Sequence, residues 1–138
     1  MKHKWADIEN AFDFVSYGRQ YENEAYLNLT TGEIHIRSEA SDVDELPEDF
    51  EEKYDNYLSI PHKNELDSGR RLVSDFVEEF MPRQEDTVRR LFKKRGAYAK
   101  YKALLEEHGL LQKWYDYETE KAAAALKEWC RKNNLECE

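Results

Sequence analysis

The sequence predicts an α+β protein: an N-terminal helix, a small three-stranded antiparallel sheet, and a four-helix C-terminal half packed on that sheet. Apolar residues recur at helical spacing near the N-terminus, alternate with polar residues over short runs, and return to helical spacing from Asn64 onward. A length of 138 residues suits one domain. We therefore expect a single domain over residues 1–138, with the helix and sheet in residues 1–61 and the helical half in residues 62–138.

The first helix is predicted over residues 4–15, where the apolar residues follow one helical face. These are Trp5, Ile8, Ala11, Phe12 and Val15. A stripe of this kind indicates an amphipathic helix whose apolar side is buried.

Two alternating runs then predict a β-hairpin. Leu27 and Leu29 alternate with polar neighbours, Thr30-Thr31-Gly32 forms the turn, and Ile34 and Ile36 resume the alternation. Because a hairpin alone is marginally stable, we expect the run Tyr57-Leu58-Ser59-Ile60 to add a third strand, ending at Pro61 at a sheet edge.

An acidic loop, residues 38–55, is predicted between the second and third strands. Residues 39–55 contain nine acidic residues and one base, Lys53. Leu46, Phe50 and Tyr54 recur every four residues, which favours a short helical turn held to the core.

Four helices follow in the C-terminal half. Their predicted limits are Asn64 to Phe80 before Pro82, a short helix around Val88–Phe92 closing before Gly96, Tyr98 to Gly109, and Leu111 to about Asn133. Asn64 is expected as an N-cap and Gly109 as a C-terminal stop.

The basic segment, residues 89–102, is the strongest functional signal. It contains seven bases and no acid, although the whole chain has a net charge of -9. The candidate binding residues are Arg89, Arg90, Lys93, Lys94 and Lys100. On a helix, Phe92 falls on the apolar face and the cations Arg89, Arg90, Lys93 and Lys94 on the solvated face. Tyr98 and Tyr101 share a face with Leu105 and are likewise predicted to be buried.

Catalytic and metal-binding motifs are absent from the sequence. It has no glycine-rich phosphate loop and no zinc motif, and its four histidines lie on separate predicted elements. We predict no catalytic residue, no metal site and no cofactor, and we do not expect an enzyme. Cys130 and Cys137 are interpreted as free thiols in a reducing compartment, although a helix end near Asn133 could bring them together.

Several stretches resemble uncharacterised protein family 0158 of bacteria. They are Leu46-Pro47-Glu48-Asp49-Phe50, Ile60-Pro61, Arg95-Gly96-Ala97-Tyr98-Ala99-Lys100-Tyr101-Lys102, Trp114-Tyr115-Asp116-Tyr117-Glu118 and Glu128-Trp129. The resemblance spans residues 10–135 and implies a small bacterial, cytosolic α+β protein; it supplies no catalytic residues. Its pattern directs attention to Gly96, Tyr98, Tyr101, Trp114 and Tyr117.

These observations favour a cytoplasmic binding or regulatory protein, a monomer or homodimer, whose partner is another protein. The alternative is nucleic-acid binding through the basic segment, although the acidic loop could instead cover that segment internally. A third hypothesis is an enzyme with an unrecognised site. No apolar run is long enough to cross a membrane, so no membrane partner is expected.

Overall fold

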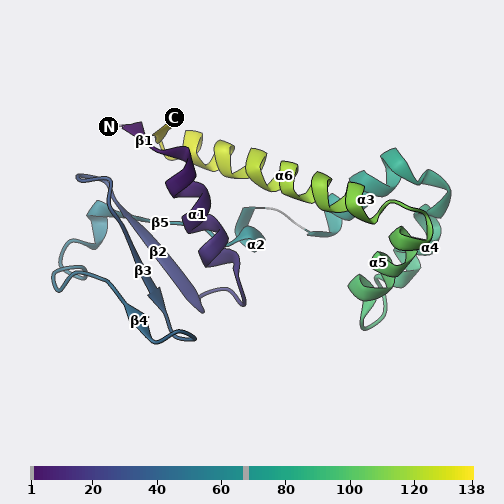
Figure 1. Cartoon of the computed structure of the whole chain (residues 1–138), viewed down its shortest axis with the longest axis horizontal. Coiled ribbons are helices and arrows are strands. Elements are labelled where there is room, and N and C mark those ends of the chain that lie inside the picture. Colours follow the sequence, from purple (N-terminus) through teal and green to yellow (C-terminus); the bar gives the residue numbers. More distant parts are fainter. Residues whose placement is uncertain (1, 67–68) are drawn as a thin grey trace. The chain divides into compact units, whose positions relative to one another are not determined.

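The α+β class is confirmed by the computed structural model, which describes residues 2–66 and 69–138 (Figure 1). In chain order the elements are β1 (Lys2–His3), α1 (Trp5–Ser16), β2 (Asn23–Asn28), β3 (Ile34–Ser38), β4 (Val43–Asp44), η1 (Tyr54–Asn56), β5 (Tyr57–Ser59), α2 (Lys63–Leu66), α3 (Gly69–Phe80), η2 (Pro82–Gln84), α4 (Glu85–Leu91), α5 (Ala97–Glu107), α6 (Leu111–Lys132) and β6 (Glu136–Cys137).

Contacts divide the chain into two compact units. Unit 1 comprises residues 1–66 and 125–138, and unit 2 comprises residues 67–124. The last part of α6 therefore belongs to unit 1 and its first part to unit 2. The predictions of a single domain, and of a helical half packed on the sheet, stay predictions.

Unit 1 is built on an antiparallel sheet with the strand order β4-β3-β2-β5, and α1 packs against β2 (Figure 1). The hairpin pairs Leu27 with Ile34, and β5 joins β2 as predicted. Ile8, Phe12 and Val15 of α1 are buried, as the helical stripe requires.

The sheet has a fourth strand that the sequence analysis did not predict. β4 lies inside the acidic loop and pairs antiparallel with β3, with Arg37 opposite Asp44. Phe50 is buried and its ring lies 4.7 Å from that of Tyr26 on β2. The predicted helical turn is present, because the Lys53 amide donates to the Asp49 carbonyl at 3.0 Å. The acidic loop is therefore anchored to the sheet at two places, through the pairing of β4 with β3 and through the contact of Phe50 with Tyr26.

Unit 1 also contains a short parallel pair that joins the chain ends. β1 pairs with β6, with Lys2 opposite Glu136 and His3 opposite Cys137. This pairing was not predicted, since two-residue strands carry no periodic signal.

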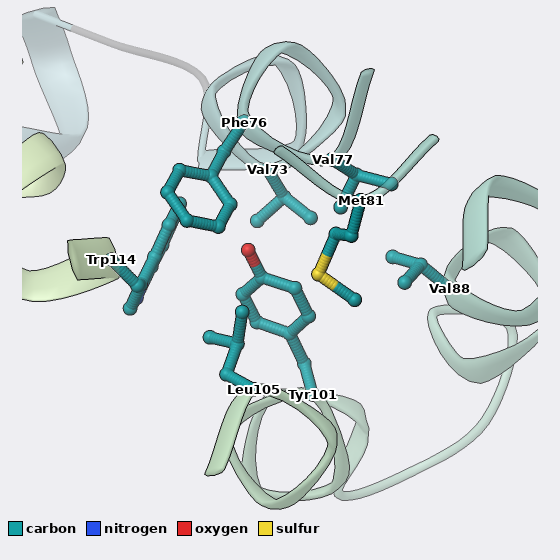
Figure 2. Packing of buried hydrophobic residues seen from close by; sticks show 8 residues of the cluster. All are labelled: Val73, Phe76, Val77, Met81, Val88, Tyr101, Leu105 and Trp114. Carbon is teal, nitrogen blue, oxygen red and sulfur yellow. The ribbon is translucent and has the colours of Figure 1, made fainter. Parts of the chain in front are cut away.

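Unit 2 has a core of its own. Its buried residues come from α3, α4, α5, the start of α6 and the α3–η2 connection; they are Val73, Phe76, Val77, Met81, Val88, Tyr101, Leu105 and Trp114 (Figure 2). α3 ends at Phe80, before Pro82, as predicted. The sequence predicted one helix from Asn64 to Phe80, with Asn64 as its N-cap. α2 begins one residue earlier, at Lys63, so Asn64 lies inside the helix, and α3 ends at Phe80. Residues 67–68 between them are outside the described residues.

Within residues 2–66 and 69–138, no helix combines the length and apolar character that a membrane crossing requires.

Candidate functional site

A hollow on the surface of unit 2 contains two of the predicted binding residues. Its volume is about 290 Å³. The lining residues are Val73, Ser74 and Val77 of α3, Glu85, Val88 and Arg89 of α4, and Phe92 and Lys93 of the turn after α4.

The apolar floor of the hollow follows from helical spacing. Val73 and Val77 lie one turn apart on α3, and Val88 and Phe92 are four residues apart at the end of α4. The Phe92 amide donates to the Val88 carbonyl at 3.2 Å, which continues the helical geometry beyond Leu91. The three valines are also members of the unit 2 core, so the floor is the outer surface of that core.

The rim of the hollow carries more positive than negative charge. The lining residues include two cations, Arg89 and Lys93, and one carboxylate, Glu85. Arg89 Nη1 lies 3.3 Å from the Asp86 Oδ1 on the same helix, and both side chains are exposed. Exposed pairs of this kind are worth no more than about 1 kcal/mol, so Arg89 can exchange this partner for another carboxylate.

The other predicted binding residues do not line the hollow. Arg90 is exposed, and its Nε donates to the Asp86 carbonyl oxygen at 3.3 Å. Lys94 follows in the turn and Lys100 lies on α5, both exposed. The structure therefore brings Arg89 and Lys93 together around one apolar floor and leaves Arg90, Lys94 and Lys100 outside it.

The second of the four predicted helices is shorter at its C-terminal end than expected. α4 ends at Leu91, so Lys93 and Lys94 lie in the turn that leads to α5. Gly96 closes this turn with a φ of 70°, a left-handed conformation that glycine adopts without a steric penalty. Phe92 is half-buried, packs against the core and lies 5.7 Å from the Tyr101 ring, as the helical-face argument predicted.

Aromatic residues of the family pattern form the centre of unit 2. Tyr101 and Trp114 are fully buried, with their ring centroids 5.1 Å apart and nearly perpendicular. Tyr117 lies 5.2 Å from Phe76. Figure 2 shows the Tyr101 hydroxyl directed toward the α3 side chains Val73 and Phe76. These residues pack the core beneath the hollow.

The prediction that Tyr98 is buried is wrong. Its side chain is 41% exposed, because it lies at the edge of the core on the first turn of α5. Its hydroxyl accepts a hydrogen bond from Trp114 Nε1 at 3.1 Å and donates one to Glu118 Oε2 at 3.1 Å. Burial is the largest cause that raises the pKa of Tyr98. The position at the edge lets the hydroxyl connect a buried indole to a surface carboxylate.

Tyr101 has a different environment, although it carries the same functional group. Its hydroxyl is buried and has no hydrogen-bond partner among the described residues. Burial raises the pKa of this phenol above its ordinary value.

Two of the histidines, His62 and His108, form hydrogen bonds with nearby backbone groups. His62 is buried; its Nδ1 accepts from the Asn64 amide at 3.0 Å, so Nε2 donates to the Gly18 carbonyl at 3.1 Å. His108 Nδ1 lies 2.9 Å from the Leu104 carbonyl oxygen at the end of α5. Residues 2–66 and 69–138 hold no group of three or more side chains suited to a metal ion.

Six residues of the hollow were not predicted as site residues: Val73, Ser74, Val77, Glu85, Val88 and Phe92. No pattern within a single helix indicates that part of its buried face borders a hollow formed with another helix.

Comparisons with known proteins agree with the resemblance seen in the sequence. Neither the curated proteins nor the solved structures include a significant match. The sequence model of one family matches residues 7–137, which is nearly the whole chain. The chain therefore belongs to the uncharacterised protein family UPF0158.

Proposed function

We propose that this protein is a non-enzymatic binding protein and that the hollow of unit 2 holds a segment of another protein. The segment presents an apolar side chain with carboxylates beside it. The observation that carries the proposal is the combination of an apolar floor with Arg89 and Lys93 at its rim.

The size of the hollow favours an anchoring side chain over a whole cofactor. Sites for small-molecule ligands enclose roughly 300–1,000 Å³. At about 290 Å³ the hollow lies at the lower end of that range. A large apolar side chain seated here removes its own apolar surface and that of half-buried Phe92 from water, with a gain of about 25 cal/mol per Å². Val73, Val77 and Val88 add little, because each is at most 5% exposed.

The charge at the rim selects for carboxylates beside the anchor. The Arg89 guanidinium can form paired hydrogen bonds with a carboxylate, and Lys93 adds a mobile point charge. Lys93 has no ion-pair partner within residues 2–66 and 69–138. Acidic and basic residues nearly balance in unit 2, so the net negative charge of the chain lies in unit 1. The electrostatic field at the hollow is therefore less negative than the net charge of the whole chain suggests.

Nucleic acid fits this surface less well than a protein segment. Binding single strands requires open aromatic faces on which bases stack. Phe92 is half-buried against Tyr101, and the Tyr98 hydroxyl is bonded to the Glu118 carboxylate, which repels a nearby phosphate. The apolar floor also offers nothing to a phosphate. Nucleic-acid binding through Arg89, Arg90, Lys93, Lys94 and Lys100 is the second candidate.

The test compares two charge reversals in the same segment. Arg89→Glu with Lys93→Glu changes both rim cations, while Arg90→Glu with Lys94→Glu makes the same change in charge outside the hollow. Arg89 and Arg90 both lie in the last turn of α4, so the loss of a favourable helix-dipole interaction is matched. Circular dichroism checks that both variants fold.

The probe is a fluorescein-labelled amphipathic peptide with Leu and Phe on one helical face and Asp and Glu around them. A peptide with Lys in place of the acids and a fifteen-nucleotide single-stranded RNA serve as comparisons. Fluorescence anisotropy measures binding to the full-length protein. We expect the acidic peptide to bind the wild type, to lose at least about tenfold in affinity with the rim variant and less than about threefold with the matched variant.

Equal losses for both variants contradict a role for the hollow. If both variants also lose RNA binding, with a steep salt dependence in the wild type, the second candidate replaces the first. Failure of the acidic peptide to bind the wild type contradicts the proposal.

A further inference from the structure

The two cysteines of the chain meet at the end of α6, far along the sequence from the hollow. α6 ends at Lys132, and Asn134 takes a left-handed conformation with a φ of 59°. The Leu135 amide donates to the Cys130 carbonyl oxygen at 2.9 Å, which closes a tight turn. The chain then returns as β6, which carries Cys137 (C-terminus in Figure 1).

Cys130 and Cys137 lie close enough for Cys137 to contribute, after burial, to raising the pKa of the Cys130 thiol. Cys130 is buried and Cys137 is partly exposed, and both are free thiols. They line the same hollow in unit 1, whose volume is about 460 Å³. The helix end that the sequence suggested near Asn133 therefore does bring these thiols together.

The N-terminal segment of the chain holds Cys137 in this position through backbone hydrogen bonds. Cys137 pairs with His3 in the β1–β6 ladder. The next residue, Glu138, donates its amide to the His3 carbonyl at 2.9 Å and accepts from the Trp5 amide at 3.1 Å. These backbone hydrogen bonds fix the position of Cys137 beside the start of α1.

We propose that Cys130 and Cys137 form a thiol–disulfide exchange site that takes a small anionic disulfide of the glutathione type and becomes an intramolecular disulfide. The proposal does not depend on the proposed binding function. Lys127 and Arg131 also line this hollow, together with one acidic residue, Glu138. Because Arg131 is already paired with Glu128, Lys127 supplies the positive charge for a carboxylate of such a disulfide.

The exchange has two steps and is balanced. The Cys137 thiol loses its proton, and its thiolate attacks one sulfur of glutathione disulfide; the S–S bond breaks and one glutathione thiolate leaves and takes up a proton. The Cys130 thiol then loses its proton to the solvent, and its thiolate attacks the Cys137 sulfur of the mixed disulfide. The Cys137–glutathione S–S bond breaks, and the expelled glutathione thiolate takes up a proton. Two protein thiols are oxidised and one glutathione disulfide is reduced to two glutathione molecules.

The environment of the thiols assigns the order of attack. Burial, and after it the interaction with Cys137, raises the pKa of the Cys130 thiol to about 12, so Cys130 remains protonated near neutral pH. Because only a thiolate attacks, the more exposed Cys137 reacts first and Cys130 resolves the mixed disulfide.

The experiment incubates full-length protein in glutathione buffers of increasing disulfide fraction and follows the intact mass and the number of free thiols. The wild type is expected to lose two hydrogen atoms and both thiols while remaining monomeric. It is also expected to gain on the order of 5 °C in Tm, reversed by dithiothreitol, because the disulfide closes a loop at the C-terminus. Cys130→Ser is expected to stop with one bound glutathione, and Cys137→Ser to react at least about tenfold more slowly.

Any of three results overturns the proposal. The wild type could retain both thiols in the most oxidising buffer, accumulate bound glutathione without an internal disulfide, or form disulfide-linked dimers. Because the main result is read on the wild type, it stands even if Cys130→Ser fails to fold. In that case Cys130→Ala gives the second measurement, with the same expected single glutathione.

Discussion

Removal of the Tyr101 hydroxyl is expected to stabilise the protein, which is the opposite of the usual effect of trimming a buried side chain. Tyr101 is fully buried, and its hydroxyl has no hydrogen-bond partner in the part of the chain that the structure describes. In the unfolded chain, water binds this hydroxyl. Folding therefore loses those hydrogen bonds without replacing them, at a cost of about 1–3 kcal/mol.

Tyr101→Phe removes this cost and introduces a smaller one. The space left by one oxygen atom is roughly 10–15 Å³, which at about 24 cal/mol per Å³ costs about 0.3 kcal/mol. The ring contacts with Phe92 and Trp114 remain. The net gain in the free energy of unfolding is about 1–2 kcal/mol, or about 3–7 °C in Tm for a chain of this size.

The matched control is Tyr98→Phe, the same chemical change at a hydroxyl with two partners. This variant loses the hydrogen bonds to Trp114 and Glu118 and leaves the buried indole N–H without its acceptor. We expect it to lose about 1–2 kcal/mol. Urea denaturation, followed by circular dichroism at equilibrium, gives both values with the slope m as a check on the unfolded state. A Tyr101→Phe variant less stable than the wild type refutes the reasoning.

Three further predictions concern unit 2. Burial raises the pKa of Tyr101, so the folded state favours the neutral phenol. The resulting contribution to the free energy of unfolding is fully present below the unfolded tyrosine pKa of about 10 and is lost as the pH rises above it. Stability between about pH 10 and 11.5 should fall less steeply in Tyr101→Phe than in the wild type, measured by urea denaturation, and parallel curves contradict this assignment. Gly96→Ala should lower the free energy of unfolding by about 1–2 kcal/mol, because a φ of 70° is strained for a residue with a side chain. The space around the new Cβ is open, so no steric clash adds to this cost. An unchanged denaturation midpoint argues against that turn geometry. Trp114→Ala removes the largest fully buried side chain and should cost about 3–5 kcal/mol, seen as a lower thermal midpoint; a loss below about 1 kcal/mol is incompatible with the packing in Figure 2.

Features with a local periodic signal were predictable from the sequence. The helix expected over residues 4–15 is α1 at Trp5–Ser16, and the last helix ends at Lys132, close to the expected Asn133. The hairpin was predicted because alternation and a glycine-containing turn are both short-range properties. The basic segment was evident because charge can be read directly from the residues.

Features made by pairing of distant segments were not predictable. The strands β1, β4 and β6 have only two residues each, and each is a strand because it pairs with a segment distant in the sequence or in a neighbouring turn. The exposure of Tyr98 likewise depends on where α6 places Trp114 and Glu118, since a helical wheel for α5 alone puts Tyr98 on the buried face.

The amino-acid order alone determined the α+β class, most helix limits, the hairpin and the charged segments, because these depend on neighbours within one or two turns of chain. The tertiary structure decided which of these residues share a surface. It placed Arg89 and Lys93, but not Arg90 or Lys94, beside the valines of α3, and it brought the Cys137 thiol back to Cys130. A hollow or a thiol pair forms only where atoms from separate elements come together. The packing of the whole chain decides where this happens, so the sequence of a single segment does not reveal it.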